Sequence, residues 1–215
     1  MRTAAILPVK SFGRAKQRLG GGFADRPRLA AAMLADVLAA LGRSGGLDEL
    51  IVVTAEPAAA AAARAAGAHV VHDPVEAGQS PAAARGIAAA LAGGAERVLL
   101  VPGDCPALDA AEVARLLART ESVVIVPDRH GQGTNALLLT PPGVLAPAFG
   151  PGSLARHAAL ARAAAASVKV CELPTLCLDV DTPDDLAALR RALAERPLDA
   201  PGTRALLEHP AHAAA

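Results

Sequence analysis

The stretch Arg97-Val-Leu-Leu-Val-Pro-Gly-Asp104 places an uninterrupted apolar run directly before a turn and a carboxylate. A run of Val and Leu without alternating polar positions is typical of a strand that is buried on both faces of a parallel sheet. Pro102 and Gly103 are turn-forming residues that would end this strand. We therefore expect Asp104 at the carboxyl end of a buried strand, which is the edge where α/β sheets bind their ligands.

Similar apolar runs alternate with helical patterns on both sides of this stretch. Further strands are expected at residues 3–9, 50–54, 68–72, 122–126, 135–140, 168–173 and 176–180. Helices are expected at residues 26–41, 57–66, 81–91, 153–165 and 183–195, with one more that follows Leu108 and ends near Arg119. This order predicts an α/β fold: a single-domain, Rossmann-like three-layer sandwich with a mostly parallel mixed sheet. The predicted domain covers residues 1–196, and residues 197–215 are expected to form a loosely ordered tail.

The composition argues against several classes of function. The chain has 21 Lys and Arg against 21 Asp and Glu, and 1% aromatic residues, so neither charge nor stacking favours nucleic-acid binding. Apolar stretches end well before the ~20 residues that a bilayer crossing needs, and no signal-peptide pattern is found, so we expect a cytoplasmic protein without membrane contact. Cys105, Cys171 and Cys177 lack C-x-x-C spacing and are expected to be reduced. The oligomeric state stays open, with a homodimer as one option.

Two acidic segments follow apolar runs. Besides Asp104, the segment Leu178-Asp-Val-Asp-Thr-Pro-Asp-Asp-Leu186 offers Asp179 and Asp181, which point to one side of an extended chain. Asp184 and Asp185 instead belong to the start of the last helix, where they favour its dipole. Because Mg²⁺ prefers one or two carboxylates together with phosphate oxygens and water, Asp104 and Asp181 are the candidate Mg²⁺ ligands. Asp179 is expected to orient Asp181.

A basic segment follows the first predicted strand. Leu7-Pro-Val-Lys-Ser-Phe-Gly-Arg-Ala-Lys-Gln-Arg-Leu19 carries Lys10, Arg14, Lys16 and Arg18. Cations at a strand end could hold a polyphosphate through charge and the forked donors of arginine. Taken alone, these charges are equally consistent with a solvated basic loop.

Two glycine-containing loops could bind a small anion. Gly131-x-Gly-x-x-Ala136 matches the letters of a dinucleotide fingerprint, but a strand follows it instead of a helix, which argues against a dehydrogenase. Glycines beside Thr134 and Asn135 suit a backbone that approaches a ligand closely. Ser153 is expected at the start of a helix, where free N–H groups attract carboxylate or phosphate.

These segments, taken in order, resemble the GT-A-like nucleotidyltransferases, and within them the CofC/FbiD guanylyltransferases of deazaflavin coenzyme biosynthesis. The resemblance spans residues 4–193. It rests on five blocks: Leu7-Pro-Val-Lys10 with Ala15-Lys-x-Arg-Leu19, Gly103-Asp-x-Pro-Ala-Leu108, Asp128-Arg-His-Gly-x-Gly-Thr-Asn-Ala-Leu137, Phe149-Gly-Pro-Gly-Ser153 and Asp179-Val-Asp-Thr-Pro-x-Asp-Leu186.

The resemblance implies transfer of GMP from GTP to phosphoenolpyruvate or 2-phospho-L-lactate, with release of pyrophosphate. It implies that Asp104 and Asp181 hold Mg²⁺, that Lys10 and Lys16 assist catalysis beside Asp104, and that the small phosphorylated acid binds at Thr134, Gly150 and Ser153. Nucleotide contacts would come from Pro8, Lys10, Lys16, Arg18, Asp73, Gly78 and Ser80. One block departs from the pattern, since Gly78-Gln-Ser80 replaces the usual Gly-Leu-Asn-like turn and leaves the selection of guanine open.

Two other hypotheses remain at the level of sequence. A nucleotidyltransferase of the same fold could use another acceptor, such as molybdopterin or a sugar phosphate. Alternatively, the chain could be a catalytically silent homologue that binds a nucleotide without releasing pyrophosphate.

Overall fold

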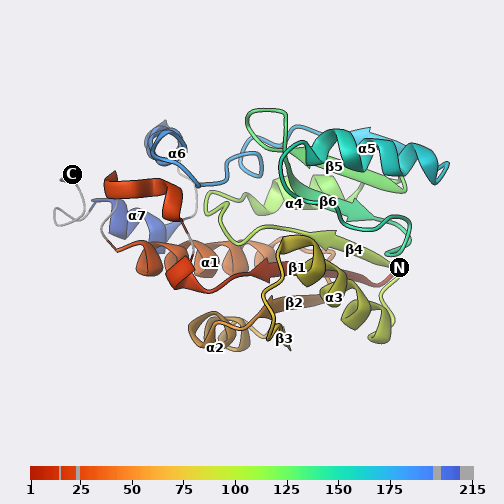
Figure 1. Cartoon of the computed structure of the whole chain (residues 1–215), viewed down its shortest axis with the longest axis horizontal. Coiled ribbons are helices and arrows are strands. Elements are labelled where there is room, and N and C mark those ends of the chain that lie inside the picture. The colour runs from red at the N-terminus through yellow and green to blue at the C-terminus, as the bar shows by residue number, and fades with distance from the viewer. Residues whose placement is uncertain (15, 23–24, 196–199, 209–215) are drawn as a thin grey trace.

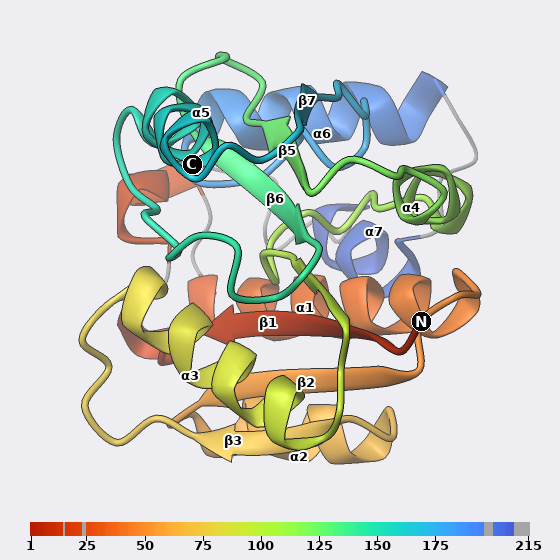
Figure 2. The same cartoon turned by 90° about the vertical axis from the view of Figure 1, so that its right-hand side faces the viewer.

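A computed structural model describes residues 1–14, 16–22, 25–195 and 200–208 of the chain. Its centre is a seven-stranded sheet in the order β3-β2-β1-β4-β6-β5-β7 (Figures 1 and 2). The strands are β1 (Thr3–Val9), β2 (Glu49–Thr54), β3 (His69–His72), β4 (Arg97–Leu100), β5 (Val123–Pro127), β6 (Thr134–Leu139) and β7 (Val168–Val170). The α-helices are α1 (Arg26–Arg43), α2 (Pro57–Ala65), α3 (Gln79–Ala92), α4 (Ala110–Leu117), α5 (Ser153–Ala163), α6 (Pro183–Glu195) and α7 (Pro201–Glu208).

The sheet is parallel except for one strand. β6 runs antiparallel to both of its neighbours, β4 and β5, whereas β5 and β7 pair in parallel. The amino end of β6 therefore lies at the same edge as the carboxyl ends of β1, β4 and β5. This reversal brings the residues that open β6 beside the loops that follow the other strands, and so decides where the site forms.

Helices cover both faces of the sheet, as the uninterrupted apolar strands predicted. One apolar cluster packs α1, α2 and α4 against one face, and a second packs α3 and α5 against the other. α3 lies so close to β1 that a Cβ atom on Gly86 would be 2.3 Å from Cγ2 of Ile6. The α/β fold class and the three layers predicted from the sequence are confirmed.

The expected strands and helices are observed within three residues of their predicted bounds, with one exception. Residues 176–180 do not pair as a strand. β7 already occupies the free edge of β5, so this segment instead runs past the carboxyl edge of the sheet, where the N–H of Val180 donates to the carbonyl oxygen of Asp104 over 3.1 Å. The prediction of a strand there was wrong.

The carboxyl-terminal segment is more ordered than expected. Residues 201–208 form α7, whose first N–H groups are accepted by the buried carboxylate of Asp36 at 3.1 Å (Gly202) and 2.8 Å (Thr203). Leu206 and Leu207 are buried in a third apolar cluster that joins α6, α7 and the start of α1. For these residues the prediction of a loose tail was wrong, because a cap and two apolar side chains dock the helix. Residues 197–199 and 209–215 of the predicted tail lie outside the described residues.

Within the described ranges, no helix combines the length and the apolar composition that spanning a membrane would require.

Candidate active site

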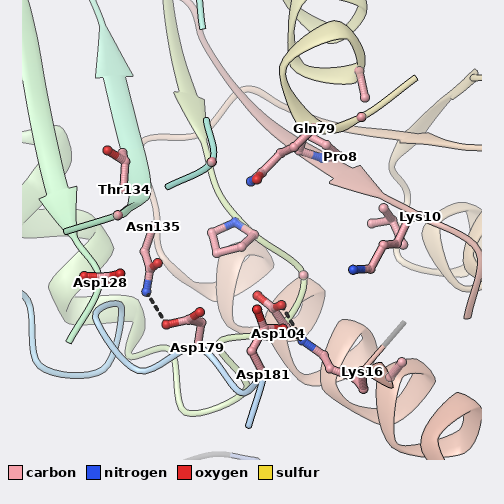
Figure 3. A pocket seen from close by; sticks show the side chains of 18 of the residues that line it. Pro8, Lys10, Lys16, Gln79, Asp104, Asp128, Thr134, Asn135, Asp179 and Asp181 are labelled. Carbon is pink, nitrogen blue, oxygen red and sulfur yellow. Dashed lines mark hydrogen bonds and ion pairs between the residues drawn. The ribbon is translucent and has the colours of Figure 1, made fainter. Parts of the chain in front are cut away.

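A pocket of about 830 Å³ opens at the edge where β1, β4 and β5 end and β6 begins (Figure 3). Its walls include Lys10 and Lys16 after β1, Asp104 after β4, and Thr134 at the start of β6. The pocket is within the size range of sites that bind drug-sized ligands and cofactors. Loops that are remote in sequence therefore contribute to one site, as the positions of their polar residues predicted.

The acidic and basic segments meet at Lys16. Its ammonium group forms ion pairs with Asp104 and, at 3.1 Å, with Oδ1 of Asp181. Lys16 is 4% exposed, so this cation is held inside the protein between two carboxylates. Arg18 pairs with the other oxygen of Asp181 from the solvent side. The two predicted metal ligands thus lie together, bridged by Lys16, for which the resemblance implied a catalytic role and a nucleotide contact but not an ion pair with both carboxylates.

The pKa values in this cluster reflect the same pairing. Burial lowers the pKa of Lys16, but the charges of Asp104 and Asp181 outweigh it and raise the pKa overall. Burial raises the pKa of Asp181, but the cations of Lys16, Arg18 and Lys10 outweigh it and lower the pKa overall. Lys16 and Asp181 are therefore both charged near pH 7.

The arrangement fits a divalent cation that is shared with a ligand. Oδ1 of Asp104 is buried and has no hydrogen-bond partner among the described residues, which is costly for a carboxylate oxygen unless something binds it. Over the same part of the chain, no three His, Cys, Asp or Glu side chains gather as a complete metal site. Mg²⁺ in enzymes is commonly bound by one or two carboxylates, and water and phosphate oxygens supply the remaining ligands. Two carboxylates without a third protein ligand are therefore enough for a Mg²⁺ site.

Asp179 lies beside the two carboxylates on the same wall of the pocket (Figure 3). Burial and the nearby charge of Asp104 raise its pKa to about 6. Nδ2 of Asn135 donates to it at 3.1 Å and also donates to the carbonyl oxygen of Leu176 at 3.0 Å. Asn135 thus holds the segment that carries Asp179, a role that the sequence did not reveal.

Asp185 supports Asp181 from the start of α6. Its Oδ2 accepts the N–H groups of Asp181 at 3.1 Å and of Thr182 at 2.8 Å, which confirms the structural role predicted for it. Its other oxygen accepts Nε of Arg129 at 2.5 Å. Arg129, in the loop between β5 and β6, was not singled out in the sequence, although it lies in the block Asp128-Arg-His-Gly.

The three residues expected to bind the small acid line the pocket together. Thr134 is the first residue of β6, Gly150 lies in the loop before α5, and Ser153 is the first residue of α5. Gly150 has a φ of +109° and Gly152, at the N-cap of α5, a φ of +71°, conformations that favour glycine. No side chain caps α5, but its first two N–H groups already have backbone acceptors: Ser153 donates to the carbonyl oxygen of Gly150 at 3.0 Å, and Leu154 donates to that of Gln132 at 3.2 Å. The positive end of the helix dipole still favours an anion at this wall of the pocket.

Most of the residues expected to contact the nucleotide also line the pocket: Pro8, Lys10, Lys16, Arg18, Asp73 and Gly78. Ser80 does not. Its hydroxyl accepts the N–H of Phe149 at 2.9 Å and so ties the start of α3 to the loop before α5. Gln79 extends into the pocket in its place (Figure 3).

Two glutamates anchor the basic loop after β1, and neither was expected from the sequence. Oε1 of Glu76 accepts the N–H of Ser11 at 2.6 Å, and Oε2 of Glu56 accepts the N–H of Phe12 at 3.0 Å. These contacts fix the backbone that precedes Lys16. Sequence spacing gives no signal for them, because Glu56 and Glu76 follow other strands.

Comparisons with known proteins agree with this fold. A crystal structure from Desulfovibrio desulfuricans G20, described provisionally as a nucleotide-diphospho-sugar transferase, superposes with a TM-score of 0.73 at 20% identity, covering 96% of this chain and 94% of that one. Rv0371C from Mycobacterium tuberculosis H37Rv, solved as a complex with manganese, has a TM-score of 0.52 at 25% identity and covers 88% of this chain and 97% of its own.

The sequence relatives are more specific than the structural ones. Phosphoenolpyruvate guanylyltransferase from Conexibacter woesei is 52% identical over 213 residues, which is 96% of either chain. Residues 3–190 match the family described as "Guanylyl transferase CofC like". The chain belongs to the CofC guanylyl transferase family.

Proposed function

We propose that the protein transfers GMP from GTP to phosphoenolpyruvate, releasing pyrophosphate and forming a diphosphate-linked guanosine intermediate of deazaflavin coenzyme biosynthesis. The observation that carries this proposal is the pocket itself, in which a paired-carboxylate centre faces an anion-binding wall. Asp104 and Asp181 form the first, and Thr134, Gly150 and Ser153 belong to the second. The name of the relative from Conexibacter woesei supports phosphoenolpyruvate over 2-phospho-L-lactate as the acceptor.

The chemistry needs positioning and charge neutralisation more than acid–base catalysis. An oxygen of the acceptor phosphate attacks the α-phosphorus of GTP, one P–O bond forms, and the bond to the β-phosphate oxygen breaks as pyrophosphate leaves. A phosphate monoester is already ionised near pH 7, so the attacking oxygen needs no general base. Most of the rate then comes from holding the two reactants in line and stabilising the growing negative charge.

Mg²⁺ held by Asp104 and Asp181 would neutralise phosphate oxygens as charge develops on them. The unpartnered Oδ1 of Asp104 supports this assignment, as does the manganese complex of the 25% identical neighbour. Lys16, released from its two carboxylates, can then pair with phosphate oxygens. Lys10 and Arg18, which line the pocket after β1, add positive charge for the leaving pyrophosphate.

The acceptor binds on the wall formed by the start of β6 and the start of α5. Its carboxylate and phosphate both need hydrogen-bond donors, and this wall offers the hydroxyl groups of Thr134 and Ser153 beside the positive end of the α5 dipole. A small acid with two anionic groups matches this set of donors better than a neutral sugar does.

The test is incubation of the purified protein with GTP, Mg²⁺ and phosphoenolpyruvate, followed by measurement of pyrophosphate and of the product mass. Asp104→Asn is expected to lower pyrophosphate release by at least about a hundredfold, whereas Asp184→Asn is the matched control. Asp184 is exposed near the site and does not line the pocket, and its substitution removes the same charge as Asp104→Asn does. Wild-type turnover by Asp104→Asn would contradict the metal role, and GTP binding without release to any acceptor would indicate a silent homologue.

A further inference from the structure

His157 lies behind the wall where the acceptor is proposed to bind. It is on α5, one turn after Ser153, and it is fully buried. Both of its ring nitrogens have partners: Nδ1 is 3.0 Å from Oγ1 of Thr134, and Nε2 is 2.9 Å from the backbone nitrogen of Ala148. The ring therefore connects β6, the loop before α5, and α5 itself.

The hydrogen bond with Ala148 decides which nitrogen carries the proton. A backbone N–H can only donate, so Nε2 must be the unprotonated, accepting nitrogen. Burial and the charge of Arg156 lower the pKa of His157 to about 4, so the ring is neutral near pH 7. In a neutral ring with Nε2 unprotonated, the proton is on Nδ1, and this N–H donates to Oγ1 of Thr134.

The direction of this bond determines what Thr134 can do. With one lone pair of Oγ1 occupied by the imidazole N–H, the hydroxyl proton of Thr134 is left to donate elsewhere. Thr134 lines the pocket on the side opposite Lys10 (Figure 3). Because this hydroxyl can only donate a further hydrogen bond, it favours a ligand atom that accepts one, such as a carboxylate or phosphate oxygen.

The same ring also fixes the loop that contains Gly150. The ring of Phe149 meets the imidazole edge-on, with centroids 5.2 Å apart. Arg156 holds the carbonyl oxygens of this loop, donating to Ala148 at 3.0 Å and to Pro151 at 2.5 Å, while His157 holds the N–H of Ala148. The loop is thus held through both a backbone N–H group and backbone carbonyl oxygens.

We propose that His157 is the positioning residue of the acceptor site: its Nδ1–H sets the hydroxyl of Thr134 as a donor to the anionic acceptor, and its Nε2 fixes the loop that carries Gly150. This inference rests on the proposed function for the identity of the acceptor. It assigns a role to a buried residue that does not contact the reacting atoms, so its effect must pass through Thr134 and the loop.

Two substitutions separate the two nitrogens. His157→Gln places an amide oxygen near the position of Nε2 and keeps the bond to Ala148, but loses the donor to Thr134. His157→Asn places an amide nitrogen near the position of Nδ1 and keeps that donor, but loses the bond to Ala148. We expect His157→Gln to raise the KM for phosphoenolpyruvate about tenfold, with the KM for GTP within about twofold of wild type. His157→Asn keeps the donor to Thr134 and should therefore raise the KM for phosphoenolpyruvate less than His157→Gln does.

Coupling to Thr134 distinguishes positioning from general support of the fold. In a Thr134→Val background, His157→Gln should raise the KM for phosphoenolpyruvate by less than about twofold, because the hydroxyl that it orients is already absent. Equal effects in the two backgrounds, or an unchanged KM in the single variant, would overturn the proposal.

A spectroscopic measurement on the unmodified protein covers the case in which the variants do not fold. Correlation of the imidazole ring protons with ¹⁵N at pH 7 should show a protonated Nδ1 and an unprotonated Nε2 for His157, and the opposite tautomer would refute the inference. If the wild-type protein does not convert phosphoenolpyruvate, the proposed function fails. The tautomer of His157 is decided independently of that result.

Discussion

Nζ of Lys16 lies 3.1 Å from Oδ1 of Asp181, in a contact that joins residues 165 positions apart in the chain. The same ammonium group pairs with Asp104, so one buried cation holds the two candidate metal ligands together. Two carboxylates this close to one another would repel without a cation between them. If the proposed Mg²⁺ binds there, Lys16 and the ion are alternative ways to neutralise the same pair of carboxylates.

Replacing this cation should make the protein depend on Mg²⁺. We expect Lys16→Met to lower the free energy of unfolding by about 1–3 kcal/mol without Mg²⁺, because it leaves Asp104 without its ion-pair partner and Asp181 with Arg18 alone. Added Mg²⁺ should restore more stability to this variant than to wild type. Thermal unfolding with and without the ion measures both effects, and Lys169→Met, at an exposed position on β7, is the control. Equal stabilisation of all three proteins by Mg²⁺ would contradict the prediction.

The close contact of α3 with β1 should not tolerate a methyl group. Gly86→Ala is expected to destabilise the protein by about 1–3 kcal/mol, because the new Cβ would be 2.3 Å from Cγ2 of Ile6 and 3.0 Å from Cγ2 of Val53. Gly42→Ala, in α1, meets nothing within 4 Å and should be neutral or stabilise by up to about 1 kcal/mol. Urea unfolding of the two variants measures the contrast, and similar stabilities would show that α3 can move away from the sheet.

The docking of α7 should depend on Asp36. Asp36→Ala removes the acceptor of two N–H groups at the start of α7, and we expect the free energy of unfolding to fall by about 1–2 kcal/mol together with faster proteolysis within α7. Asp36→Asn keeps one side-chain oxygen and should lose less. Limited proteolysis followed by mass measurement locates the cleavage. Unchanged cleavage in Asp36→Ala would mean that Leu206 and Leu207 dock the helix without the cap.

His157 should make stability fall as the pH is lowered from about 6.5 to about 4. In the folded protein burial and the charge of Arg156 lower its pKa to about 4, whereas the unfolded ring takes a proton near its ordinary pKa of about 6.5. Between these values the unfolded state binds more protons, so stability is complete above about pH 6.5 and is reduced by at most about 3 kcal/mol near pH 4.

Asp179 titrates in the same range with the opposite sign. Its pKa of about 6 in the folded protein lies above its ordinary value, so the metal-free protein gains stability as this carboxyl takes up a proton. The contribution of His157 is therefore the difference between wild type and His157→Asn, measured by chemical unfolding without Mg²⁺ from pH 7 to pH 4. A difference that does not change with pH would contradict the lowered pKa of His157.

Much of the architecture could be predicted because the relevant signals are local. Uninterrupted apolar runs such as residues 97–101 indicated buried strands, and the helical patterns between them indicated the two covering layers. The position of Asp104 after such a run also predicted that it would lie at the edge of the sheet where ligands bind. Asp181 meets it there for a different reason than predicted, because the segment before Asp181 is not a strand and is held by the hydrogen bond from Val180 to the carbonyl oxygen of Asp104. Residues 176–180 show the limit of this reasoning, since an apolar segment forms a strand only where a sheet edge is free.

The sequence by itself determined the α/β alternation, the acidic and basic loops at strand ends, and the family that they resemble. Only the tertiary structure decided that β6 runs antiparallel, that Lys16 lies between two carboxylates, that His157 lies behind Thr134, and that α7 docks on Asp36. The physical reason is the separation in sequence of the residues that interact. Helix and strand patterns arise from neighbouring residues, whereas strand direction and buried polar pairs depend on partners that only folding brings within hydrogen-bond distance.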